Sequence, residues 1–237
     1  LAAAAPGGVA AVAMAAASGN TLLTDAAGTP LTPIISLMDR RAELQPPSTL
    51  AGLDAAHVAQ VTGWPCVTIF PLAHLAWLRE NRPAVYAGAG HYGMDTDWLI
   101  HQLTGKWVMD HSTATTFHLQ EQTRGMYHTP FLERLGIPPS KLSTLVRSGT
   151  AVGPLTARAG RETGLSPRTV VVTGCFDHPA AARAVGVESP GQLMLSCGTS
   201  WVGFVPCMDR QAVLDAQMLC DPFLSADGGP WAGMFSV

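Results

Sequence analysis

The chain opens on an almost wholly apolar run from Val9 to Ala17. Because the run lacks polar positions at either a two-residue or a helical period, it predicts a buried central strand or a helix of small residues. A strand that is apolar on both faces needs neighbours on each side. We therefore expect the chain to continue before Leu1, and the segment Met234–Val237 likewise stops within an element.

Short elements separated by turn residues follow. Apolar segments at 21–24 and 31–37 flank the turn Asp25–Gly28, which predicts a hairpin at a sheet edge. Ser48 has the character of an N-cap, so one helix is expected to run from there to about Val61. Further helices are expected at 39–44, 71–81, 97–103, 131–135 and 156–163.

The last third alternates strands and helices. Thr169–Gly174 is rich in β-branched residues and predicts a strand, and Asp177 lies where that strand ends. An Ala-rich helix over 179–185 begins with proline in its first turn. Two strands within 192–205 are joined by a turn of small residues, and no internal repeat interrupts the pattern. The order of elements predicts an α/β layered fold.

Composition narrows the class of protein. Of 237 residues, 47% are hydrophobic and 13% charged, which excludes a disordered chain. The 14 Lys and Arg residues against 17 Asp and Glu leave no basic excess, so we expect no nucleic-acid partner. No stretch approaches the roughly 20 apolar residues of a membrane span, so we expect no membrane partner. The five cysteines form no C-x-x-C pair, which favours reduced thiols in the cytoplasm.

Two short segments carry candidate chemistry. Asp177 lies at the carboxyl end of a strand and before a helix, where α/β folds place ligands, and its carboxylate could accept a proton from a substrate hydroxyl. Its alternative is a plain N-cap for the helix at 179–185. The turn Gly198-Thr199-Ser200 offers backbone N–H groups and hydroxyls to a phosphate, or is an ordinary hairpin turn. Together the two segments favour phosphoryl transfer.

Other candidates are weaker. The run Asp39-Arg40-Arg41 is either a polar cluster at a site or a solvated helix start. The histidines His111, His118 and His128 lack zinc-site spacing, which favours hydrogen-bonded or surface roles. The sequence contains no Walker A, G-x-G-x-x-G or G-x-S-x-G motif.

A set of segments along nearly the whole chain resembles the FGGY carbohydrate kinases. In chain order these segments are Ile34–Ala42, Leu75–Pro83, Asp97–Gly105, Asp110-His-Ser112, Ser148-Gly-Thr150 with Val152-Gly153, Val172–Asp177 and Cys197–Ser200. The resemblance implies an actin-like, ribonuclease-H-type fold with a mixed sheet flanked by helices. It further implies that residues 1–186 form an incomplete sugar-binding domain I and that residues 187–237 begin an ATP-binding domain II.

The same resemblance assigns roles to residues. Asp177 matches the catalytic base that lies near Mg-ATP, so ATP and Mg²⁺ are the implied cofactors. Gly198, Thr199 and Ser200 match a phosphate-binding hairpin. The remaining matches are to residues that contact a sugar or polyol substrate: Ser18, Gly19, Asn20, Asp39, Arg41 and His178. The resemblance leaves open whether the chain forms a homodimer.

Departures from the family pattern limit these expectations. The family's Asp-x-Gly-Thr phosphate motif has no counterpart before Val9, so we expect a fragment or a truncated reading frame that is inactive alone. Ser18-Gly19 replaces the Met-His of xylulokinase and the Arg-Glu of glycerol kinase, and His74 stands where relatives often have Lys. The rival hypotheses are a non-catalytic sugar-binding remnant of the same fold and an unrelated α/β binding domain, in which Asp177 and Thr199 would lie far apart.

Overall fold

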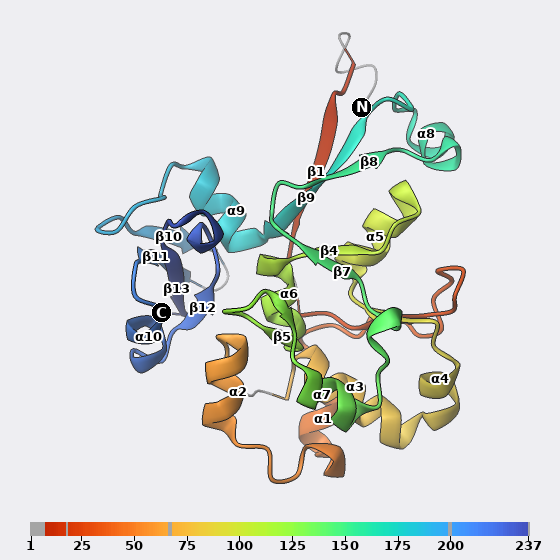
Figure 1. The fold of residues 1–237 in the computed structure, drawn as a ribbon, viewed down its shortest axis with the longest axis horizontal. Helices are drawn as coiled ribbons and strands as arrows, with labels where there is room; N and C mark the ends of the chain where they lie inside the picture. Colours follow the sequence, from red (N-terminus) through yellow and green to blue (C-terminus); the bar gives the residue numbers. More distant parts are fainter. Residues whose placement is uncertain (1–7, 18, 66–67, 199–200, 237) are drawn as a thin grey trace.

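The computed structural model describes residues 8–17, 19–65, 68–198 and 201–236. Its central sheet has the order β1-β9-β8 (Figure 1). Strand β1 (Ala11–Ala16) runs parallel to β9 (Val170–Phe176), and β8 (Ala151–Pro154) pairs with β9 in the antiparallel sense. The apolar opening run is therefore a strand and not a helix. The expectation that it is buried is wrong, because β1 is an edge strand in the described part of the chain and its residues alternate between exposed and half-buried.

Gly174 fixes how β1 and β9 meet. The register between them shifts between Ala13 and Ala15, which marks a bulge. A Cβ atom on residue 174 would lie 1.6 Å from the carbonyl oxygen of Met14, so only glycine permits this approach. Beyond the bulge the strands pair again and end together, with Ala16 opposite Phe176.

Helices surround the sheet and occupy most of residues 41–135. The helices are α1 (Arg41–Leu44), α2 (Ala55–Thr62), α3 (Pro71–Asn81), α4 (Pro83–Gly88), α5 (Asp95–Thr104), α6 (His111–Phe117), α7 (Thr129–Leu135), α8 (Ala157–Thr163), α9 (Asp177–Ala184) and α10 (Arg210–Asp215). Within the described ranges, none of them combines the length and the apolar character needed to cross a bilayer.

The single helix expected from Ser48 to Val61 is wrong. Ser48–Leu50 forms one 3₁₀ turn, and α2 begins only after Asp54, whose carboxylate accepts from the Ala56 N–H at 2.9 Å. Glu80 of α3 holds the earlier turn by accepting from the Ser48 hydroxyl at 2.9 Å, and Gly52 breaks the chain direction with φ of 72°. Ser48, which the local sequence predicts as the N-cap of the expected helix, therefore bonds to Glu80 of a distant helix instead.

Several short two-stranded ladders complete the larger unit, which is the part of the chain that precedes the four-stranded sheet at the C-terminus. Strand β2 (Leu22–Thr24) pairs with β3 (His91–Gly93). The second strand of the expected hairpin, at 31–37, is not a regular strand, and only single bridges join Thr21 to Ile35 and Thr24 to Pro30. The other two ladders join β4 (Val108–Asp110) to β7 (Thr144–Val146) and β5 (Gln120–Glu121) to β6 (Met126–Tyr127).

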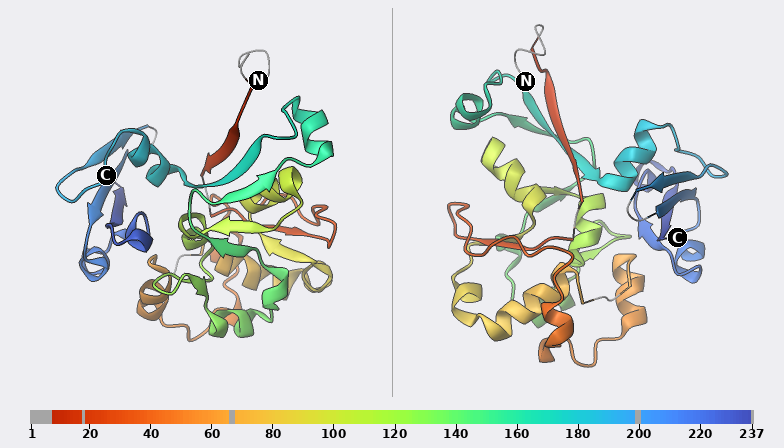
Figure 2. Two further views of the ribbon diagram at one scale, coloured as in Figure 1. Left: turned by 45° about the horizontal axis from the view of Figure 1, so that its top comes forward. Right: turned by 180° about the vertical axis from the view of Figure 1, so that it is seen from behind.

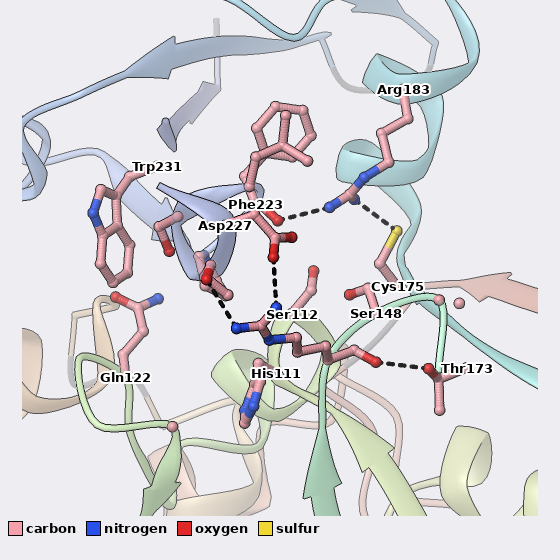
Figure 3. A pocket seen from close by; sticks show the side chains of 18 of the residues that line it. His111, Ser112, Gln122, Ser148, Thr173, Cys175, Arg183, Phe223, Asp227 and Trp231 are labelled. Atoms are coloured by element: carbon pink, nitrogen blue, oxygen red, sulfur yellow. Dashed lines mark hydrogen bonds and ion pairs between the residues drawn. The ribbon is translucent and has the colours of Figure 1, made fainter. Parts of the chain in front are cut away.

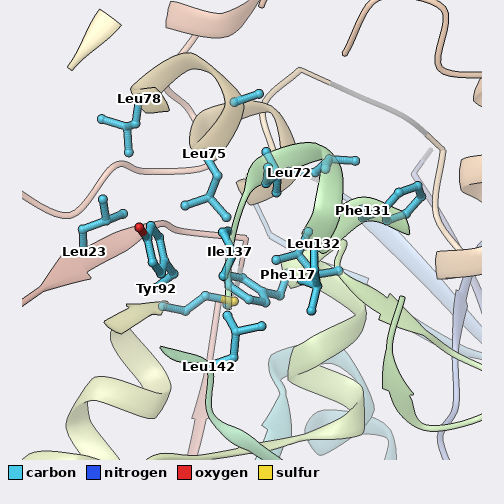
Figure 4. Close-up of a cluster of buried hydrophobic side chains, with 14 of the residues drawn as sticks. Leu23, Leu72, Leu75, Leu78, Tyr92, Phe117, Phe131, Leu132, Ile137 and Leu142 are labelled. Carbon is cyan, nitrogen blue, oxygen red and sulfur yellow. The ribbon is translucent and has the colours of Figure 1, made fainter. Parts of the chain in front are cut away.

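The main hydrophobic core lies between α3, α6 and α7 (Figure 4). Leu72 and Leu75 of α3 pack against this cluster together with Phe117 of α6 and Phe131 of α7, and each is at most 2% exposed. Burying one such side chain contributes about 1.5–3 kcal/mol. The helix α6, which contributes Phe117 to this core, also packs against β9.

A four-stranded antiparallel sheet forms the C-terminal unit beside α9 (Figure 2). Its order is β10 (Met194–Cys197), β11 (Trp201–Cys207), β13 (Trp231–Ser236) and β12 (Leu219–Asp221). Cys220 of β12 joins it to the larger unit: its N–H donates to the Gly63 carbonyl at 2.9 Å, and its carbonyl accepts from Trp64 Nε1 at 3.0 Å.

A buried polar contact reinforces this joint. Ser112 donates its hydroxyl hydrogen to Asp221 at 2.6 Å, although the residues are 109 positions apart. Asp221 is fully buried, and burial raises the pKa of its carboxyl to about 6, while Arg183 opposes and Asp110 adds to this rise. The contact therefore exists at the cost of desolvating a carboxylate.

The close approach at Gly174 predicts a large effect of one methyl group. We expect Gly174→Ala to destabilise the fold by more than about 3 kcal/mol, because overpacking against backbone cannot be relieved by a side-chain rotation. Gly88→Ala is the control, since a Cβ there meets nothing within 4 Å, and it should stay within about 1 kcal/mol of the parent chain. Urea unfolding followed by tryptophan fluorescence measures both, and equal losses would contradict the assigned contact.

Asp221 predicts a pH dependence of stability. Its folded pKa of about 6 exceeds the ordinary value of 3.8, so between these values the unfolded chain binds fewer protons and stability falls as pH rises. Asp221→Asn should flatten the stability profile between pH 4 and 6, and the difference should reach at most about 3 kcal/mol. Urea unfolding at half-unit pH steps tests this, and parallel profiles would refute it.

Candidate active site

The carboxyl ends of β1 and β9 bring two of the predicted segments together. Because the strands are parallel and end with Ala16 opposite Phe176, Ala17 and the start of α9 leave the sheet at the same edge. Ligands of open α/β sheets bind at such edges. This adjacency makes the edge the candidate site.

Asp177 is the first residue of α9 and is not its N-cap. Phe176 occupies the cap position, and no side-chain capping bond is present. The Asp177 carboxylate accepts from the His178 N–H at 2.8 Å through Oδ1, and its side chain remains 42% exposed. The alternative role as a helix cap is therefore wrong, and the side chain remains accessible to a ligand.

The loop before β2 is held from both sides. Asn20 donates from Nδ2 to Asp95 at 2.9 Å and accepts from the Leu37 N–H at 3.1 Å. Gly19 is buried with φ of 89°, and a Cβ there would lie 2.9 Å from the Phe70 ring. The Asn20 amide therefore positions the loop, and Phe70 fills the space of a side chain at position 19. Ser18 lies outside the described residues.

Asp39 and Arg41 form a bidentate ion pair. The guanidinium donates to both carboxylate oxygens at 2.9 and 2.8 Å, lies 5.0 Å from the centroid of Trp77, and lowers the pKa of Asp39 to about 2. The pair therefore stays charged over the whole neutral range.

His74 connects this ion pair to the loop. Its Nδ1 lies 3.0 Å from the Thr21 hydroxyl and its Nε2 lies 3.4 Å from the Asp39 carbonyl. Burial lowers its pKa, so the ring is a neutral bridge. Sequence reasoning treated His74 only as a departure from a family pattern and missed its bridging role, as it missed Asp95 and Phe70. These contacts span 35 to 75 residues, and no local spacing signals them.

The predicted phosphate hairpin exists as a hairpin. Strands β10 and β11 pair through Cys197 and Trp201, and Gly198 begins the turn between them. Thr199 and Ser200 lie outside the described residues. The hairpin and the Asp177 edge are connected through α9, which packs against β1, β9 and β11.

A cavity of about 570 Å³ lies between the two units (Figure 3), and its lining includes Gly174 and Cys175 of β9, close to where that strand ends before Asp177. Its wall includes Ser112, Ser148, Cys175 and Arg183, and Arg147 crosses it to Asp227 and the Ala226 carbonyl. Among the residues that the structure describes, none of the predicted site residues lines it.

Two of the segments that resemble the family, Asp110-His-Ser112 and Ser148-Gly-Thr150, contact each other beside this cavity. Asp110 caps α6 by accepting from the Ser112 and Thr113 N–H groups at 3.0 Å, and it also accepts from the Ser148 hydroxyl at 3.1 Å. Burial raises the pKa of Asp110. These motifs therefore hold β4, α6 and the segment after β7 together.

The carboxylates do not gather into a metal cage. Among the residues that the structure describes, no group of three or more His, Cys, Asp or Glu side chains could hold a metal ion. A cation that uses only one or two carboxylates together with ligand phosphates, as Mg²⁺ does, remains compatible with Asp177.

Comparison with known proteins identifies the family to which the sequence is similar. A family model for the N-terminal domain of the FGGY family of carbohydrate kinases matches residues 4–184. An autoinducer-2 kinase from Yersinia enterocolitica is 35% identical over 130 residues, which are 55% of this chain and 25% of that protein. The match thus spans about a quarter of the relative's length.

Solved structures agree in fold. A xylulose kinase from Lactobacillus acidophilus matches with a TM-score of 0.84 at 20% identity, over 97% of this chain and 46% of that one. A glycerol kinase from Plasmodium falciparum with ADP matches with a TM-score of 0.83 at 17% identity, over 96% and 46%. The predicted actin-like α/β fold is confirmed. Because the family model covers most of the sequence, the chain belongs to the FGGY family of carbohydrate kinases.

Proposed function

We propose that this chain forms the sugar-binding part of an ATP-dependent kinase that phosphorylates a hydroxyl group of a sugar or polyol. The observation that carries the proposal is the half-exposed Asp177 carboxylate at the shared edge of β1 and β9, in a chain of the FGGY family. Residues 1–186 would bind the acceptor and residues 187–237 would begin the ATP-binding domain, in the cytoplasm.

Asp177 acts as the general base in this proposal. The His178 N–H fixes one carboxylate oxygen, so the carboxylate is oriented before a substrate arrives. It accepts the proton of the attacking hydroxyl as that oxygen bonds to the γ-phosphorus of ATP and the bond between this phosphorus and ADP breaks. ATP would supply the phosphoryl group, and Asp177 would help to hold a Mg²⁺ ion that offsets the charge of the phosphates.

The acceptor would lie along the loop 18–20 and the polar pair Asp39–Arg41. Arg41 and Asp39 are satisfied by each other, so they present a fixed charge pattern to substrate hydroxyls. His178 follows the base and would contact the same molecule, while Gly198, Thr199 and Ser200 would meet the phosphates.

The relatives indicate candidate substrates. The named activities among them are the phosphorylation of autoinducer-2, xylulose, gluconate and glycerol. All are small molecules with several hydroxyl or carbonyl oxygens. We therefore propose a small polyhydroxylated acceptor, and autoinducer-2 belongs first in any panel because that relative shows 35% identity.

Asp177→Asn tests the proposal. In the complete encoded protein we expect a loss of 10²- to 10⁴-fold in turnover, because an amide cannot take the proton, with substrate affinity changed little. A coupled assay of ADP release measures turnover over autoinducer-2, pentuloses, gluconate and polyols.

Asp215→Asn is the matched control, since Asp215 is an exposed carboxylate on α10 that bonds, among the described residues, only to Gln211 one turn earlier. It should keep parental turnover. Sugar-dependent ADP release that survives in Asp177→Asn would refute the general-base role. No release by the parent protein over the panel would support the non-catalytic remnant instead.

A further inference from the structure

His118 ends α6 in a backbone conformation that the other helices give to glycine. Its φ is 61°, whereas four other helices end on left-handed glycines: Gly63, Gly105, Gly136 and Gly164. Histidine tolerates this region less well than glycine does. The helix end alone therefore does not explain why this position carries an imidazole.

Burying the His118 imidazole without hydrogen-bond partners also lowers the stability of the fold. His118 is 0% exposed, and among the described residues neither Nδ1 nor Nε2 has a hydrogen-bond partner. Burial lowers its pKa to about 3, so the ring is neutral and carries one donor and one acceptor. An unpaired buried polar group destabilises a fold, so such a group in a native protein calls for an explanation.

The ring lies directly behind the candidate site. Its centroid is 4.8 Å from that of Phe70 and 6.3 Å from that of Trp64. Phe70 in turn fills the space beside Gly19 in the substrate loop. One aromatic ring therefore separates the imidazole from the loop.

The same aromatic cluster reaches the other half of the site. Trp64 packs edge-on against Phe176 at 5.8 Å, and Phe176 packs against His178 at 5.5 Å. Phe70, Trp64 and Phe176 thus form one aromatic cluster that connects the Gly19 loop to the Asp177 segment.

We propose that His118 is a substrate-binding residue: Phe70 turns aside when a polyhydroxylated substrate enters beside Gly19, and the imidazole then donates one hydrogen bond to a substrate hydroxyl and accepts another. This inference rests on the proposed kinase function and adds a residue to its acceptor site. Because Gly19 offers no side chain, the hydroxyls at that position find their partner in His118. The unpaired nitrogens favour the liganded state, since only there are they satisfied.

His118→Phe is the decisive variant, because it keeps an aromatic ring against Phe70 and Trp64 and removes both nitrogens. We expect the melting temperature of the unliganded protein to stay equal or to rise. We expect KM for the acceptor found in the ADP-release panel to rise about tenfold, with kcat changed less than threefold, because two hydrogen bonds are lost. His118→Asn keeps a donor and an acceptor and tolerates the left-handed backbone, so it should recover part of the affinity.

His128→Phe is the matched control. His128 is also largely buried, has an unpartnered Nε2 among the described residues and packs against Phe131 at 4.5 Å, but it lies in the loop before α7. It should leave KM unchanged.

The outcomes separate the two proposals. A parent protein that turns over a sugar and a His118→Phe variant with the same KM would overturn the role of His118 alone. A lower melting temperature in His118→Phe with unchanged KM would show that the ring only packs, and equal KM increases in both phenylalanine variants would show a general effect of core substitution. No turnover by the parent protein would remove the kinase proposal and this inference with it.

Discussion

The rest of the structure depends on the close parallel approach of β1 and β9. Gly174 allows the Met14 carbonyl to come within a distance that any side chain would block, and the bulge beside it lets the strands end in register. The loop 17–20 and the Asp177 segment adjoin only because of this register. A fixed backbone contact between residues 160 positions apart therefore creates the edge at which chemistry is proposed.

Around that edge, polar side chains divide into those that hold structure and those that remain accessible. Asn20 bonds to Asp95, His74 bonds to Thr21, and Asp39 and Arg41 bond to each other, so these side chains form a rigid frame. Asp177 has one oxygen fixed and stays partly exposed. A preorganised frame with one oriented carboxylate suits phosphoryl transfer, in which positioning provides much of the catalysis.

The joint between the two units follows a different principle. Ser112 donates to the buried Asp221 carboxylate, whose pKa is raised. Beside this contact the Cys220 N–H donates to the Gly63 carbonyl, and the Trp64 indole N–H donates to the Cys220 carbonyl. The motifs Asp110-His-Ser112 and Ser148-Gly-Thr150 lie at this joint, so part of the family pattern in this chain serves the connection between units. The cavity of Figure 3 lies beside the same joint, and Gly174 and Cys175 of β9 are part of its lining.

Local sequence by itself determined the elements whose signals are local: the strand at β9, the helix α3 that begins at Pro71, the left-handed glycine ends of α5 and α8, and the position of Asp177 at a strand end. The ordered motifs also determined the family. Tertiary structure alone decided that Ser48 serves Glu80 instead of capping α2, that β2 pairs with β3, that His74 joins Thr21 to Asp39, and that His118 lies unpaired behind Phe70. The physical reason is that capping and turn preferences act over about four residues, whereas these contacts join groups tens of residues apart, and only packing decides which partner a polar group finds.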